Sequence, residues 1–119
     1  MTDQQVLLDE AVTQQLADMM GEAMAMLLDQ YVETVETAVS EIQTEYQAGN
    51  ADEVFPKAHT FKSLSAQFGA QPLSNLFKEI EHAARHGDLQ SISQQVTDLP
   101  ELVTNTLAQI ADYRTRQGI

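Results

Sequence analysis

The sequence predicts an all-α fold, an antiparallel up-and-down four-helix bundle with a short additional N-terminal helix. Apolar residues recur at three- and four-residue spacing through almost all of the 119 residues, without the sustained alternation that strands show. Short links join these stretches, so each amphipathic helix has to bury its apolar face against its neighbours in sequence. We therefore expect one domain spanning residues 1–119.

The first two predicted helices lie in the N-terminal half of the chain. A short helix is expected over 8–19, and it ends near Gly21, because glycine favours a helix terminus. A longer helix is expected over 28–47, where an apolar stripe faces a side that carries several glutamates. It ends at Gly49 and Asn50, which both tolerate a left-handed backbone.

Three further helices are predicted in the C-terminal half. The third covers about 52–68 and ends at Gly69, and the fourth covers 72–85. The fifth covers 89–113, but Pro100 lies inside its apolar pattern. Because proline cannot donate a helical hydrogen bond, we expect it to kink or split this last helix.

The composition limits the classes of function. The chain has no cysteine, which excludes disulfides, thiolate metal sites and a cysteine nucleophile and fits a reducing compartment. A net charge of -12 argues against binding nucleic acid or an anionic membrane, since both require a basic face. The sequence has no basic leader and no apolar run near the roughly 20 residues that span a bilayer. We expect a cytoplasmic monomer whose partners are proteins.

The charge is distributed unevenly along the chain. Residues 1–56 contain twelve Asp and Glu and no Lys or Arg, whereas residues 57–119 contain six of each sign. Four of the six basic residues fall in a central stretch, which we interpret as neutral or positive ground on an acidic molecule. Those four residues are Lys57, Lys62, Lys78 and Arg85. Taken singly, each also fits an ordinary solvated helix face.

His59 stands out within the third helix because of its phase. At about 100° per residue, the buried face of this helix lies between about 140° and 260° from His59. The residues on that face are Val54, Ala58, Phe61, Leu64, Ser65 and Phe68. His59 is therefore expected to face solvent, where a neutral imidazole offers a nucleophilic nitrogen.

The residues on the same side of the helix are suited to a reactive site. Lys62 lies one turn after the histidine, where its ammonium can stabilise negative charge arriving on the ring. Ser63 and Ala66 are small enough to let a partner approach. Phe55 and Ala66 add apolar area, and Gln67 lies at the flank. We predict that Phe55, Ser63, Ala66 and Gln67 form a docking surface.

Two segments resemble the histidine-containing phosphotransfer (HPt) family. Residues 58–73, AHTFKSLSAQFGAQPL, resemble its typical pattern A-H-x-L-K-G-S-A-x-x-L-G-A-x-x-L. Residues 80–88, IEHAARHGD, resemble the segment L-E-x-x-x-R-x-G-D that closes the next helix in that family. Ser63 replaces the usual glycine, and Phe61 and Phe68 replace leucines, which alters packing more than chemistry.

The resemblance implies a phosphoryl carrier in a two-component phosphorelay. His59 would accept the phosphoryl group from a receiver-domain aspartate and pass it to another receiver, with Lys62 stabilising its charge. The implied partners are response-regulator receiver domains and a hybrid sensor kinase. The receiver would supply Mg²⁺, so this chain is expected to need no cofactor and to have no kinase active site of its own.

Two alternatives come from other classes of protein. An acidic helical adaptor without phosphoryl chemistry could dock partners through Phe55 and the methionine-rich segment 19–26. A metal ion could bind His82 and His86 with Glu79 one turn before them, although two histidines and a glutamate are more often exposed polar residues. We therefore expect no metal site.

Overall fold

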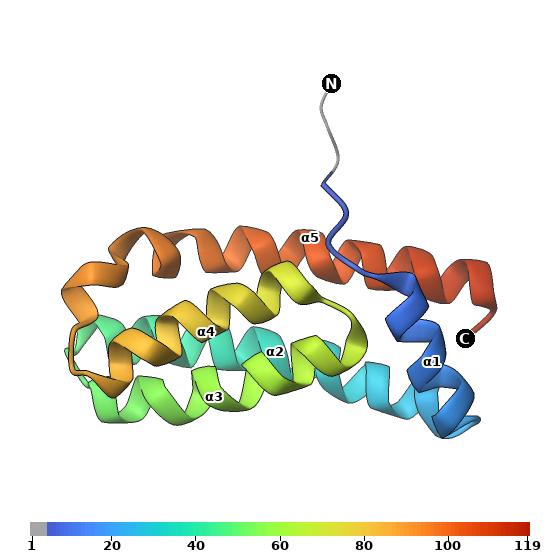
Figure 1. Ribbon diagram of the computed structural model, residues 1–119, viewed down its shortest axis with the longest axis horizontal. Helices are drawn as coiled ribbons and strands as arrows, with labels where there is room; N and C mark the ends of the chain where they lie inside the picture. Colours follow the sequence, from blue (N-terminus) through green and yellow to red (C-terminus); the bar gives the residue numbers. More distant parts are fainter. Residues whose placement is uncertain (1–4) are drawn as a thin grey trace.

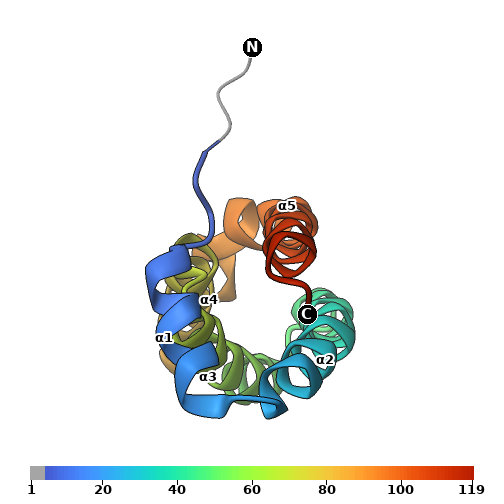
Figure 2. The ribbon, with the colours of Figure 1, turned by 90° about the vertical axis from the view of Figure 1, so that its right-hand side faces the viewer.

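The computed structural model describes residues 5–119 and is helical through most of that range (Figure 1). The helices in chain order are α1 (Glu10–Met20), α2 (Ala23–Gln47), α3 (Ala51–Phe68), α4 (Gln71–Arg85), the short 3-10 helix η1 (Leu89–Ile92) and α5 (Ser93–Gln117). Helices α2 to α5 surround a common core, and α1 lies at one end of the bundle beside α3 (Figure 2). The predicted helical bundle with a short N-terminal helix is confirmed.

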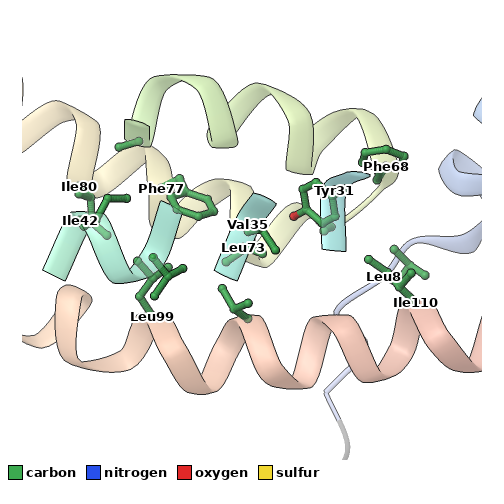
Figure 3. Close-up of a cluster of buried hydrophobic side chains, with 14 of the residues drawn as sticks. Leu8, Tyr31, Val35, Ile42, Phe68, Leu73, Phe77, Ile80, Leu99 and Ile110 are labelled. Carbon is green, nitrogen blue, oxygen red and sulfur yellow. The ribbon is translucent and has the colours of Figure 1, made fainter. Parts of the chain in front are cut away.

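The core is built from one apolar stripe on each long helix (Figure 3). Fully buried side chains of α2, α4 and α5 meet in its middle, among them Leu28, Val35, Ile42, Leu73, Phe77, Ile80 and Leu99. Burying a side chain of this size stabilises a fold by about 1.5 to 3 kcal/mol. The stripes therefore fix how each helix is rotated, and with it which residues face solvent.

Helix α3 has the predicted rotation. Val54, Ala58 and Phe68 are buried, whereas Phe61 is only partly buried against the core. Ser65 is also buried, and its hydroxyl lies 2.6 Å from the hydroxyl of Tyr31 on α2. Burial raises the pKa of Tyr31 to about 12, so this hydroxyl stays protonated and the pair links α2 to α3.

The turn between α3 and α4 anchors the N-terminal segment. Gly69 adopts a left-handed backbone with φ of 90°, and a Cβ atom there would lie 2.6 Å from the carbonyl oxygen of Asp9. The amide of Asp9 donates to the carbonyl of Gly69 at 2.8 Å. The hydroxyl of Thr13 donates to the carbonyl of Phe68 at 2.7 Å. Only glycine allows the two backbones to approach this closely.

The helix boundaries differ from expectation at three places. Leu8 precedes α1 and its side chain packs in the core, while its amide and that of Leu7 donate to the Gln109 side chain and hold this segment against α5. Helix α2 begins at Ala23, five residues earlier than expected. Residues 89–92 form the separate helix η1, and α5 then continues through Pro100 without a break. The proline does not split α5, because tertiary packing on both sides of it outweighs one lost hydrogen bond.

None of the helices in residues 5–119 is both long enough and apolar enough to cross a membrane.

Candidate functional site

His59 lies halfway along α3 and faces outward, as its phase predicts. Its side chain is 54% exposed, and within residues 5–119 its ring forms a hydrogen bond with Glu81 alone. The ring lies at the junction of α3 and α4, which are the most extensively packed pair of helices. The placement combines access from solvent with a rigid support.

Glu81 on α4 is the centre of a charged cluster beneath the histidine. One carboxylate oxygen, Oε2, lies 2.5 Å from Nδ1 of His59. The other, Oε1, lies 2.7 Å from Nζ of Lys62. Arg85 approaches Oε2 with one guanidinium nitrogen at 3.6 Å. The Glu81 side chain is only 5% exposed, so a buried carboxylate is surrounded by three cationic or potentially cationic groups.

The protonation state of Glu81 decides which nitrogen of His59 is reactive. Burial by itself would raise the pKa of Glu81, but hydrogen bonds from Lys62 and His59 outweigh it and leave the pKa below its ordinary value. The carboxylate is therefore ionised at neutral pH and only accepts hydrogen bonds. Nδ1 must then carry the proton, so that Nε2 of the neutral ring has a free lone pair.

Phe55 lies one turn before His59 and contacts two members of the cluster. Its ring stacks on the imidazole with the ring centres 5.8 Å apart and the planes 17° apart. The guanidinium carbon of Arg85 lies 5.2 Å from the centre of the same ring. The Phe55 side chain is half-buried and packs against the core. It therefore contacts the histidine while remaining partly exposed, and its part in docking stays a prediction.

A hydrogen bond beneath the cluster holds α3 and α4 in register. The hydroxyl of the buried Ser74 on α4 donates to the backbone carbonyl of Lys62 at 2.8 Å. This bond fixes the α3 backbone one turn after His59 against α4, at a serine two turns before Glu81. The distance between the imidazole and the carboxylate is therefore set by the packing of two helices.

The other predicted docking residues extend along α3 from the histidine. Ser63 and Gln67 are exposed and Ala66 is half-buried. The Ser63 hydroxyl lies 3.5 Å from the backbone carbonyl of His59, at the limit of a hydrogen bond. This side of α3 is open to an approaching surface. Docking at these residues stays a prediction.

The basic residues of the central stretch do not all converge. Lys62 and Arg85 reach Glu81, whereas Lys57 lies 3.9 Å from Glu53 on its own helix. Lys78 lines a groove between α4 and the start of α5. Two of the four residues therefore meet at one carboxylate, and the neutral or positive area stays a prediction.

Glu81 is the member of the candidate site to which the sequence alone assigns no role, since it enters the sequence analysis only as part of a motif. A signal was present, because Glu81 falls on the apolar face of α4, four residues after Phe77 and three before Ala84. A charged residue on a buried face is rarely tolerated without a partner.

The two histidines at the end of α4, His82 and His86, contact each other and the helix backbone. His86 Nδ1 lies 2.8 Å from the backbone carbonyl of His82, and the two rings are 4.5 Å apart. Glu79 accepts a hydrogen bond from the Gln95 amide at 3.0 Å. Among residues 5–119, no group of three or more His, Cys, Asp or Glu is arranged to hold a metal ion.

The bundle therefore presents one exposed histidine whose ring is bonded to a buried carboxylate. Comparison with known proteins identifies the class of protein. The family model of the Hpt domain matches residues 26–112. The chain is also similar to the crystal structure of histidine-containing phosphotransfer protein B (HptB) from Pseudomonas aeruginosa PAO1, with a TM-score of 0.87 and 28% identity. That similarity covers 95% of this chain and 98% of the other. No curated protein matches the sequence.

Because the family model spans well over half of its length, the chain belongs to the Hpt domain family. It therefore has a histidine phosphotransfer role in phosphorelay signalling. Hpt proteins are phosphocarriers rather than kinases, and they interact with receiver domains and kinases in phosphorelays.

Proposed function

We propose that His59 is the phosphoryl acceptor, taking the group from a receiver-domain aspartate and passing it to a second receiver. The observation that carries this proposal is the hydrogen bond between Nδ1 of His59 and the buried, ionised Glu81. It holds the proton on Nδ1 and leaves Nε2 as the free nucleophile on an exposed ring. Within residues 5–119, neither His82 nor His86 has a carboxylate partner of this kind.

The transfer step is balanced without a base on this chain. The lone pair of Nε2 attacks phosphorus, and the bond between phosphorus and the aspartate oxygen breaks. The receiver carboxylate leaves with that electron pair. The imidazole keeps its proton on Nδ1 and becomes more positive, and Glu81 stabilises that charge through the existing hydrogen bond. The reverse step returns the ring to its starting state.

Lys62 and Arg85 supply positive charge beside the ring. Nζ of Lys62 is bonded to Oε1 of Glu81, so this lysine is held in place before the phosphoryl group arrives. A charge fixed in advance needs no reorganisation during the reaction. Lys62 is 29% exposed, which leaves its ammonium able to reach a phosphoryl oxygen.

The partners would be response-regulator receiver domains and a hybrid sensor kinase that meet this chain in the cytoplasm. Each receiver would bring its own Mg²⁺, while this chain would act as a monomer and contribute the nucleophile and its positioning groups. Ser63, Ala66 and Gln67 would form part of the surface on which the receiver docks.

Labelling by phosphorylated receivers tests the proposal. Each receiver is phosphorylated and mixed with the wild-type chain or with His59→Gln, His82→Gln or His86→Gln. We expect an acid-labile label on the wild type and on the two control variants, and none on His59→Gln. Circular dichroism should show unchanged helicity in His59→Gln, because an exposed residue contributes little packing.

The same experiment distinguishes a phosphoryl acceptor from an adaptor that only binds receivers. An adaptor would bind receivers without becoming labelled, whichever receiver is used. Label that persists in His59→Gln, or that disappears in a control variant, would place the acceptor at another histidine.

A further inference from the structure

The ring of Phe55 stacks on the imidazole that we propose as the nucleophile. The two residues are one turn apart on α3, and the 17° angle between their planes makes this an offset parallel stack. Phe55 is anchored from below by its contacts with the core. The imidazole is therefore oriented from two directions, by the Phe55 ring at its face and by Glu81 at Nδ1.

Arg85 lies close enough to Glu81 to compete with His59. Its guanidinium nitrogen is 3.6 Å from Oε2, the same oxygen that accepts the hydrogen bond from Nδ1. That distance allows an ion pair but exceeds the 2.7 to 3.2 Å typical of an N–H···O hydrogen bond, so Arg85 does not form a hydrogen bond with this oxygen. Its guanidinium instead rests over the Phe55 ring at 5.2 Å, a favourable position for a cation on an aromatic face.

We propose that Phe55 is a positioning residue for phosphoryl transfer: its ring fixes the plane of the His59 imidazole and keeps the Arg85 guanidinium off Oε2 of Glu81. This inference rests on His59 as the acceptor and gives Phe55 a role beyond partner docking. Oε2 then stays available to Nδ1 of His59, and the tautomer with a free Nε2 is maintained.

The consequence is a dependence on an aromatic ring at this position. A leucine would keep apolar bulk for docking, but it has no flat face for the imidazole and no π electrons for the guanidinium. The ring of His59 would then rotate more freely, and Arg85 could close on Oε2. A tyrosine would preserve both contacts.

Two measurements without any partner protein test the role. The first is the rate of labelling by phosphoramidate, in which Nε2 attacks phosphorus, the P–N bond breaks and ammonia leaves. The second is the ¹⁵N NMR signature of the His59 tautomer, which needs no phosphoryl group. The variants are Phe55→Leu, Phe55→Tyr and the matched control Phe61→Leu, a half-buried aromatic of α3 that contacts Tyr31 and Phe77.

We expect Phe55→Leu to label about two- to tenfold more slowly and to lose the Nδ1–H preference, the range given by one aromatic contact. Phe55→Tyr and Phe61→Leu should remain within about twofold of wild type. Adding Arg85→Gln to Phe55→Leu should restore part of the tautomer preference, because the competing guanidinium is gone.

Other outcomes overturn the inference. If Phe55→Leu matches wild type in both measurements but binds receivers more weakly, Phe55 is a docking residue only. If the double variant is no better than Phe55→Leu, Arg85 does not compete for Glu81. Failure of the proposed function would give a different result, because His59→Gln would then still be labelled. The NMR measurement on proteins that keep His59 would still test whether Phe55 positions the imidazole.

Discussion

Glu81 and Glu10 both form ion pairs with cationic side chains, but one carboxylate is buried and the other is exposed to solvent. Glu81 is almost fully buried between α3 and α4, where it contacts His59, Lys62 and Arg85. Glu10, at the start of α1, is 42% exposed and accepts two hydrogen bonds from one arginine of α5. The two clusters contain similar groups, but only one of them lies under an exposed imidazole.

The two clusters differ most in burial, because the Glu81 side chain is 5% exposed and the Glu10 side chain is 42% exposed. The hydrogen bond from its arginine is the main reason that the pKa of Glu10 lies below its ordinary value. Water screens such an exposed pair, so its contribution to stability is small. At Glu81 the low exposure keeps the same kinds of interaction strong and fixes their geometry.

The largest effect is expected from neutralising the buried carboxylate. Glu81→Gln keeps the shape of the side chain but no longer enforces a proton on Nδ1 of His59. We expect labelling by phosphoramidate and by receivers to slow by about a hundredfold, the loss that follows from a small misplacement of a reacting group. Glu10→Gln is the matched control. Equal rates for the two variants would remove Glu81 from the chemistry.

A smaller effect is expected from removing the charge of Lys62. Lys62→Ala should slow transfer about tenfold and shorten the lifetime of phospho-His59, because a charged hydrogen bond to the phosphoryl group is lost. Binding of the unphosphorylated receiver should change little. The measurement compares transfer rates and affinities at low salt and near 0.15 M, where the screening length is roughly 8 Å.

Equal losses in both assays, both removed by salt, would mean that Lys62 only steers association.

The free energy of unfolding should depend on acid pH more strongly through Glu81 than through Glu10. The depressed pKa of Glu81 means that its ionisation stabilises the fold above about pH 4.5, and that this contribution is lost as the pH falls through the lower folded value. Denaturant melts between pH 3 and 6 should show a weaker acid dependence in Glu81→Gln than in wild type. Glu10→Gln should retain most of that dependence. Parallel curves for all three proteins would contradict the assignment.

The smallest effect is expected at the exposed cluster. Glu10→Gln should lower the free energy of unfolding by less than about 1 kcal/mol, as is usual for exposed ion pairs, and the loss should shrink as salt is added. Its rate of labelling should equal that of wild type. A larger loss of stability would show that the contact between α1 and α5 contributes more than its exposure indicates.

The sequence by itself determined the helices of the bundle and the outward phase of His59. Both follow from local regularities: apolar spacing reports the buried face of a helix, and glycines such as Gly69 mark where one ends. The HPt resemblance also rested on local runs of residues. Where local signals conflicted with packing, the sequence was less informative, as the unbroken helix through Pro100 shows.

Only the tertiary structure decided which side chains surround His59 and which one forms a hydrogen bond with its ring. Glu81 and Arg85 are 22 and 26 residues away along the chain, and no periodicity within α3 or α4 specifies how two helices are placed against one another. The same holds for Phe55. Its position on α3 predicts a docking residue, which stays a prediction, but only the structure shows its stack on the imidazole and the Arg85 guanidinium over its ring. A helix phase depends on one segment, but a buried charge and its partners depend on the packing of two.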